Sequence, residues 1–145
     1  MGKCRRATPQ DIEHLEACRR SAISACPEYD AEQLHIWLAA EPKWPPLIDD
    51  TLLVEVEGRI AGFCVATPAE LGYLYVHPDH QGQGIGRYLV GRVQQPGMRC
   101  DGNPFSGRVL KERGWVPVGP HRKERDGVVF ENTWYELPAV TPGSR

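Results

Sequence analysis

The apolar positions of the first fifty residues predict two helices and then a loop. Ile12, Leu15 and Ile23 recur at the spacing of one helical face, so residues 9–24 are expected to form a helix. A second helix is predicted over residues 30–40, where apolar residues again gather on one side. Three prolines within residues 41–50 indicate that this second helix ends in a loop.

The start of the first helix has a recognisable capping pattern. Thr8 stands at the N-cap, Pro9 at the first helical position, and Asp11 at the place where a capping box needs an acceptor. These three residues therefore fix the beginning of the helix more firmly than its apolar spacing does.

A change of period after residue 50 predicts three consecutive strands. Residues 51–57 and 59–66 are rich in β-formers and meet at Glu57-Gly58, a hairpin turn signal. Pro68 interrupts the run, and residues 70–76 form the third strand. Because the connections are short, the three strands are expected to be antiparallel neighbours.

The second half alternates between helical and extended patterns. A glycine-rich loop leads into a helix marked by Ile85, Leu89 and Val93, followed by a short strand over 98–102 and a helix over 103–113 that Asn103 caps. Residues 115–119 and 128–138 are predicted to pair as a hairpin, with the polar segment 120–127 as its loop. The chain is thus expected to form one α/β domain over residues 1–138 with a mixed sheet, and a flexible tail over 139–145.

Composition narrows the classes of protein. The 145 residues suit one domain, and the net charge of −2 argues against a dedicated nucleic-acid surface. No apolar run is long enough to span a membrane. The five cysteines are odd in number and form no C-x-x-C pair, which predicts reduced thiols in a cytoplasmic protein and no metal site.

The loop between the third strand and its following helix carries the most specific chemical signal. Gly82, Gly84 and Gly86 alternate where the helix begins, and a helix N-terminus offers unpaired N–H groups and partial positive charge. Without Cβ atoms, these donors are open to a bulky anion such as a pyrophosphate. The spacing differs from both the dinucleotide and the P-loop patterns, and an ordinary turn remains the alternative.

The stretch from Gln81 to Gly86 matches the [Gln/Arg]-x-x-Gly-x-[Gly/Ala] signature of the GNAT-type N-acetyltransferase superfamily. Residues 70–80, 103–115 and 132–137 resemble further segments of that family in the expected order. The resemblance implies a mostly antiparallel mixed sheet of six to seven strands, about four flanking helices, and fourth and fifth strands that splay apart. It also implies direct transfer of an acetyl group from acetyl-CoA to a primary amine of a small molecule or a peptide.

The resemblance carries specific residues with it. The pantetheine arm is expected along the third strand of the run at 51–76, Asn103 is expected at the pantetheine end, and the Val76 N–H is expected to donate to the oxyanion. Glu70 is the candidate base, acting through water, although an exposed carboxylate at the start of a strand is the plainer interpretation. The full set of expected cofactor contacts is Leu74, Tyr75, Val76, Gln81, Gly82, Gln83, Gly84, Ile85, Gly86, Arg87 and Asn103.

The chain also departs from the family pattern. Leu110 stands where many members have a tyrosine that protonates the leaving thiolate, and Met98 stands where some carry a basic glutamate. His77 and His80 are weaker candidates for the base because they fall in the turn that leads to the cofactor. The walls of the acceptor site are expected to draw on a set of aromatic and histidine residues and on the basic loop 121–125, namely Tyr29, His35, Trp37, Trp44, Trp134 and residues 121–125. The alternatives are that Trp37 and Trp134 belong to the core and that the loop charges form a solvated hairpin tip.

Two other functions stay open at this point. A CoA-binding or acyl-CoA-binding module without turnover fits the losses at Leu110 and Met98. A nucleotide-binding protein of another class would need a parallel sheet and an acidic ribose contact, for which Asp101 has the right distance from the loop. The sequence names neither the acceptor amine nor the oligomeric state, although homodimers are common among the relatives.

Overall fold

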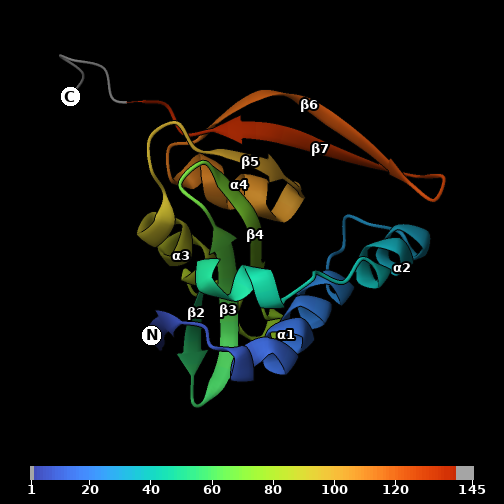
Figure 1. The fold of residues 1–145 in the computed structure, drawn as a ribbon. Helices are drawn as coiled ribbons and strands as arrows, with labels where there is room; N and C mark the ends of the chain where they lie inside the picture. The colour runs from blue at the N-terminus through green and yellow to red at the C-terminus, as the bar shows by residue number, and fades with distance from the viewer. Residues whose placement is uncertain (1, 140–145) are drawn as a thin grey trace.

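The computed structural model describes residues 2–139, so the predicted tail at 139–145 lies outside the described part except for its first residue. Its centre is one seven-stranded sheet of order β1-β2-β3-β4-β5-β7-β6 (Figure 1). The strands are β1 Lys3–Arg6, β2 Thr51–Val56, β3 Arg59–Ala66, β4 Glu70–Val76, β5 Arg99–Gly102, β6 Val116–Arg125 and β7 Val128–Glu136. Among the strand pairs of residues 2–139, only β4–β5 is parallel, which confirms the mixed, mostly antiparallel sheet.

Four α-helices accompany the sheet, as expected. They are α1 Ile12–Ser24, α2 Ala31–Ala39, α3 Ile85–Val93 and α4 Pro104–Glu112. A short 3-10 turn, Pro9–Asp11, precedes α1, and Thr8 caps it with Asp11 completing the capping box. No helix among residues 2–139 is both long and apolar enough to cross a membrane.

The two faces of the sheet carry separate hydrophobic cores. On one face, Leu89 of α3 and Leu110 of α4 pack against alternate residues of the central strands, among them Leu74. On the other face, Leu15 of α1 packs against Phe63 and its neighbours. Alternate residues of a strand point to opposite faces, so one strand supplies both cores, and the sheet is covered on both sides (Figure 1).

The parallel strands β4 and β5 pair only where they begin. Their register joins Glu70 to Arg99 and Leu71 to Cys100 and goes no further, so the strands separate beyond that point. A register shift between β3 and β4, near Val65, marks a bulge at the same level. The splayed fourth and fifth strands are therefore present.

The last hairpin differs from the prediction. The segment 120–127 was expected to be a loop, but β6 continues through it to Arg125, and only Asp126 and Gly127 form the turn. Both residues have positive φ, 50° and 78°, which is the backbone of the tight turns that suit a hairpin. The polar residues are compatible with a strand because β6 is the edge of the sheet, where charged side chains are common.

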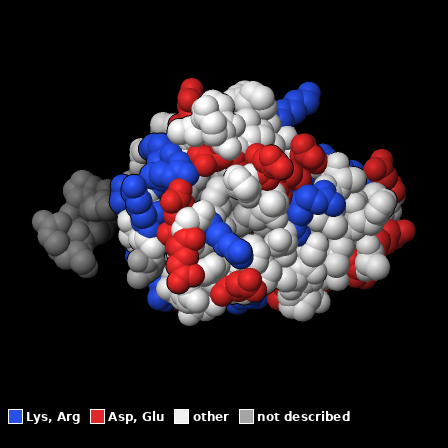
Figure 2. Space-filling view, turned by 90° about the horizontal axis from the view of Figure 1, so that it is seen from below, with Lys and Arg blue, Asp and Glu red and all other residues white. Residues whose placement is uncertain are grey.

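Charged residues of both signs share the surface. On the face drawn in Figure 2, acidic and basic side chains lie next to one another, so no single sign dominates that face. The ion pair with the most complete hydrogen bonding lies near the N-terminus. There the guanidinium of Arg5 donates to both carboxylate oxygens of Asp11, at 2.8 and 2.9 Å, and it also donates to the carboxylate of Glu55.

This carboxylate predicts how acid affects stability. Hydrogen bonds from Arg5 hold the pKa of Asp11 well below its usual range, against the opposing effect of burial. A depressed pKa in the folded state means that the stabilisation is complete at neutral pH and is lost as the pH falls below about 4, the ordinary value of an aspartate. Asp11→Asn should therefore lower the free energy of unfolding by about 2 kcal/mol at pH 7. Urea titrations at pH 7 and pH 3 check this, because the gap between the variant and the parent should shrink at pH 3.

Candidate functional site

A groove of about 390 Å³ opens at the N-terminus of α3. Gly82 and Gly84 lining it have φ of 79° and 83°, a backbone that disfavours other residues, and Gly84 is the N-cap of the helix. Within residues 2–139, no protein group accepts a hydrogen bond from the main-chain N–H of Gly82, Gly84 or Gly86. Free donors and a helix dipole thus face an open groove, the arrangement expected of an anion site.

The edge of β4 that faces away from β3 is the second part of the site. The N–H of His77 donates to Ala61 across the β3–β4 ladder, and main-chain groups alternate in direction along a strand. The N–H and C=O groups of Leu74 and Val76 consequently point toward the gap that β5 leaves. The side chain of Gln81 donates to the Val76 carbonyl at 3.1 Å, which ties the glycine loop to the end of β4.

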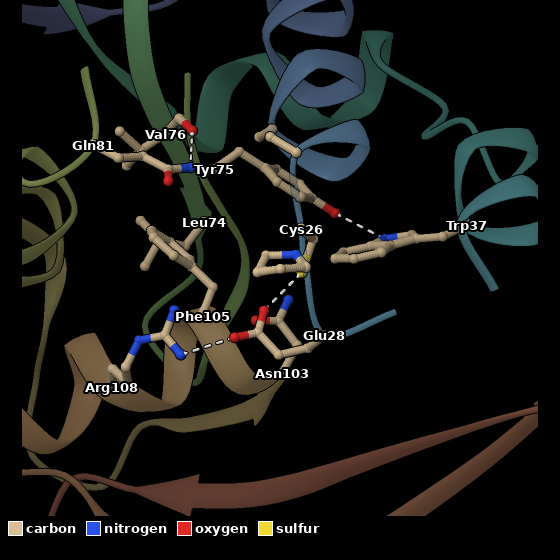
Figure 3. A pocket seen from close by; sticks show the side chains of 13 residues that line it. Cys26, Glu28, Trp37, Leu74, Tyr75, Val76, Gln81, Asn103, Phe105 and Arg108 are labelled. Atoms are coloured by element: carbon tan, nitrogen blue, oxygen red, sulfur yellow. Dashed lines mark hydrogen bonds and ion pairs between the residues drawn. The ribbon is translucent and has the colours of Figure 1, made fainter. Parts of the chain in front are cut away.

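A small cavity of about 40 Å³ lies in the middle of the gap (Figure 3). Leu74 and Val76 wall it on one side and Phe105 and Arg108 of α4 on the other. The segment before α2 closes the cavity, because Oε2 of Glu28 in that segment forms an ion pair with Nη1 of Arg108 in α4 at 3.2 Å.

The largest cavity, about 540 Å³, lies between α2, β4 and the β6–β7 hairpin. Its wall is rich in aromatic side chains, and the Tyr29 ring meets the rings of Trp37 and Phe130 edge-on at 5.1 and 5.7 Å. Trp37 donates through Nε1 to the hydroxyl of Tyr75 at 3.2 Å. Burial raises the pKa of both Tyr29 and Tyr75 to about 12, so both phenols stay protonated at neutral pH.

The three cavities form one path. The middle cavity shares Val76 and Gln81 with the groove at α3, and it shares Leu74 and Asn103 with the large cavity. Once the contact between Glu28 and Arg108 opens and widens the narrow middle cavity, a molecule with an anionic end and an extended arm can run from the helix N-terminus, along the edge of β4, to the aromatic cavity.

Most of the residues that the sequence predicts as cofactor contacts line this path. Asn103 caps α4 by accepting from the Ser106 N–H at 2.9 Å, and its side chain borders two of the cavities. Ile85 is buried in the core, so only its main chain can face the groove. Arg87 reaches the groove but also pairs with Glu112 at 2.9 Å.

The expected catalytic groups are placed less favourably. Glu70 is exposed at the closed end of the β4–β5 pair and lines none of the three cavities. Leu110 is fully buried in the core against α3, and Met98 is equally buried, so neither meets the path. The Val76 N–H faces the gap, as an oxyanion donor must.

Among the expected acceptor walls, Tyr29 and Trp37 line the large cavity. Trp44 belongs to the core with 2% exposure, and His35 is exposed on α2 away from the path. Trp134 stacks on the ring of His121 at 4.7 Å. Across the described part of the chain, no cluster of three or more His, Cys, Asp or Glu side chains is arranged to hold a metal ion.

The sequence did not single out a pair of residues that the fold brings together. His121 Nδ1 lies 3.0 Å from Asp101 Oδ1, on adjoining walls of the large cavity. Asp101 falls on the short strand β5, and His121 falls in the segment that was predicted to be a loop. Only the register of β6, β7 and β5 places them side by side, and the hydrophobic pattern carries no signal for that register.

Comparison with known proteins agrees with this geometry. Residues 48–113 match the family model described as an acetyltransferase (GNAT) domain. A search of curated sequences finds no significant match. Among solved structures, the chain is similar to the GCN5-related N-acetyltransferase from Rhodopseudomonas palustris, with 21% identity, a TM-score of 0.85, and 97% of this chain and 96% of that chain covered.

Two further structures have the same fold. One is yncA from Salmonella typhimurium, solved with its cofactor acetyl-CoA, with 19% identity, a TM-score of 0.68, and 100% and 98% of the two chains covered. The other is the ribosomal-protein-alanine N-acetyltransferase from Brucella melitensis, with 20% identity, a TM-score of 0.65, and 92% and 97% covered. These solved structures show that the chain shares their fold, and the GNAT domain model matches the part of the chain that holds the splayed strands and the glycine loop.

Proposed function

We propose that this protein transfers the acetyl group of acetyl-CoA directly to a primary amine of a small molecule or a peptide. The observation that carries the proposal is the continuous path from the free N–H groups at α3, along the open edge of β4, to the aromatic cavity. Each part of that path matches one part of the donor: an anion site for the pyrophosphate, a strand edge for the amide-rich arm, and a cavity where the thioester can meet an acceptor.

The chain's own groups would hold the donor in a defined way. The N–H groups from Gly82 to Arg87 would bind the pyrophosphate, and the side chain of Arg108 lies at the same groove to add positive charge. Leu74 and Val76 would pair with the arm as a neighbouring strand does. Asn103, at the border of two cavities, would contact the end of the arm.

The chemistry needs two contributions from the protein. A main-chain N–H of β4 would stabilise the negative charge that develops on the thioester oxygen. The expected donor, Val76, borders the groove and the middle cavity, and Leu74 is the outward-facing residue of β4 that also borders the large cavity. A base must also remove a proton from the acceptor, because an alkyl ammonium with a pKa near 10.4 needs about 4–5 kcal/mol to lose its proton at pH 7. Leu110 cannot protonate the departing thiolate, so that proton would come from solvent.

A CoA-binding module without turnover is the second candidate. Two observations favour it: the buried Leu110 at the place of the family's tyrosine, and the exposed Glu70 outside the cavities. A binding module would bind acetyl-CoA as tightly as the proposed enzyme does but would not transfer the acetyl group to an amine.

One experiment separates the two candidates. Calorimetry measures acetyl-CoA binding, and a thiol assay then measures CoA release across a panel of small primary amines and peptides with free amines. We expect binding and an amine-dependent release of CoA, with one N-acetylated product formed per thiol. Binding without release for every amine would support the module, and no binding would remove both candidates.

A further inference from the structure

Asp101 and His121 form a pair that is held from several sides. Asp101 is mostly buried, and its second oxygen, Oδ2, accepts from Lys123 at 3.1 Å. The ring of His121 stacks on the ring of Trp134 with an angle of 23° between the two planes. The guanidinium carbon of Arg99 lies 4.4 Å from the centroid of the same Trp134 ring. These contacts limit rotation of the imidazole.

The pair has a defined polarity. Nδ1 of His121 and Oδ1 of Asp101 are both buried and lie 3.0 Å apart, and neither atom completes a hydrogen bond with any described residue, the other included. A lone pair on Nδ1 would lie against the carboxylate oxygen, so the tautomer with the proton on Nδ1 is favoured. The lone pair then lies on Nε2, which is neither among the buried unpartnered atoms nor hydrogen-bonded within residues 2–139.

The other titratable groups of the large cavity are poor proton acceptors. Burial raises the pKa values of Tyr29, Tyr75 and Cys100 to about 12, so these groups are already protonated at neutral pH. The lysine and arginine side chains are cationic. Glu124 is exposed at the tip of the hairpin, where water competes with any substrate.

We infer that His121 is the base that accepts the proton of the acceptor amine, and that Asp101 is the positioning residue that fixes its tautomer. The inference rests on the proposed acetyl transfer and adds to it. Nε2 takes one proton from the ammonium form of the acceptor, and the neutral amine then forms the C–N bond to the thioester carbon and gives up its second proton to water. The C–S bond breaks, its electron pair leaves on sulfur, and water protonates the thiolate while the imidazolium returns its proton to water.

Charged and polar groups surround the pair. Asp101 faces the imidazole from β5, and Lys123 offsets part of that negative charge from β6. Tyr29 faces Asp101 from the segment before α2. Arg122 pairs with Glu131 at 3.8 Å farther along the hairpin.

The test uses the full chain with acetyl-CoA and the best amine of the panel. His121→Gln should lower kcat by about 10²–10⁴-fold and leave the Kd for acetyl-CoA unchanged. The acidic limb of the kcat–pH profile should disappear in that variant. Asp101→Asn should lower kcat by at least about tenfold. His14→Gln, an exposed histidine of α1 outside all three cavities, is the matched control and should match the parent.

Two kinetic results would overturn the assignment. One is a His121→Gln variant within threefold of the parent that keeps the acidic limb. The other is a hundredfold loss in Glu70→Gln together with normal turnover in His121→Gln, which would return the role to Glu70.

A second measurement does not depend on turnover. Long-range ¹H–¹⁵N NMR of the free protein reports which nitrogen of His121 carries the proton. We expect the proton on Nδ1, and a loss of that preference in Asp101→Asn. A proton on Nε2 in the parent would overturn the pair whether or not any amine is acetylated. Absence of turnover with the Nδ1 tautomer in place would instead count against the acetyl transfer alone.

Discussion

Replacing Gly84 by aspartate is expected to weaken acetyl-CoA binding by at least about 100-fold. The new carboxylate would stand at the N-cap of α3, where it accepts hydrogen bonds from the same N–H groups that the pyrophosphate needs. Losing charge-assisted hydrogen bonds of about 1.5–3 kcal/mol each, with added repulsion, corresponds to two or more factors of ten. Arg87, whose Nη2 lies 3.5 Å from the position of the new Cβ, would also be drawn to the aspartate. Calorimetry with acetyl-CoA measures the change.

A matched control separates this effect from backbone strain. Gly84 has φ of 83°, so any side chain there is strained, and aspartate is among the residues that tolerate this backbone best. Gly58, at the tip of the β2–β3 hairpin, has φ of 76° and open space around its Cβ position. Gly58→Asp should show similar thermal stability and normal affinity. Equal affinities in the two variants would show that the loop at α3 is not the anion site.

Removing the carboxylate of Glu16 should destabilise the fold by about 3–5 kcal/mol. Arg19 is 1% exposed, and its Nη1 lies 2.8 Å from Glu16 Oε2. Without that carboxylate, a buried guanidinium would have no opposite charge, which is among the most costly changes in a core. Trp44 would lose its acceptor as well, since its Nε1 donates to Glu16 Oε1 at 3.2 Å. Glu16→Ala is therefore expected to shift the urea midpoint strongly, as measured by tryptophan fluorescence.

The same helix offers the control. Glu13 lies one turn before Glu16 and is exposed, so Glu13→Ala should stay within about 0.5 kcal/mol of the parent. The effect of Glu16→Ala should also reach the acceptor cavity, because Arg19 donates to the carbonyls of Trp37 and Ala40 at the end of α2. If both variants unfold at the same urea concentration, Arg19 is stabilised by those carbonyls alone.

Local signals were sufficient for most of the fold. The Thr8 capping pattern, the Glu57-Gly58 turn and the strand from Glu70 to Val76 all lie where the sequence predicts them, because each depends on a few neighbouring residues. The glycine loop is similar, since helix N-cap geometry and positive φ have strong residue preferences. The splaying of the fourth and fifth strands was expected from the family resemblance rather than from any local pattern.

Features that depend on strand register, or on which side chains line a cavity, could not be predicted from the sequence. The segment 120–127 is rich in charged residues and looks like a loop, but an edge strand tolerates charge on both faces. The contact between Asp101 and His121 requires three strands to be aligned, and a shift of one residue would turn His121 to the other face. Glu70 occupies the expected position along its strand, yet position along a strand does not determine whether a side chain meets a cavity.

The narrow middle cavity bears on how a ligand would arrive. Its volume of about 40 Å³ suits on the order of three water molecules, which is too little for an extended chain of amides and methylenes. The ion pair between Glu28 and Arg108 that closes it is largely exposed, and such pairs contribute about 0–1 kcal/mol. Association should consequently proceed in two kinetic phases, a fast capture of the phosphates and a slower parting of residues 26–28 from α4. Replacing Glu28 by a basic residue would remove the ion pair with Arg108 and keep the middle cavity open, so we expect a single kinetic phase.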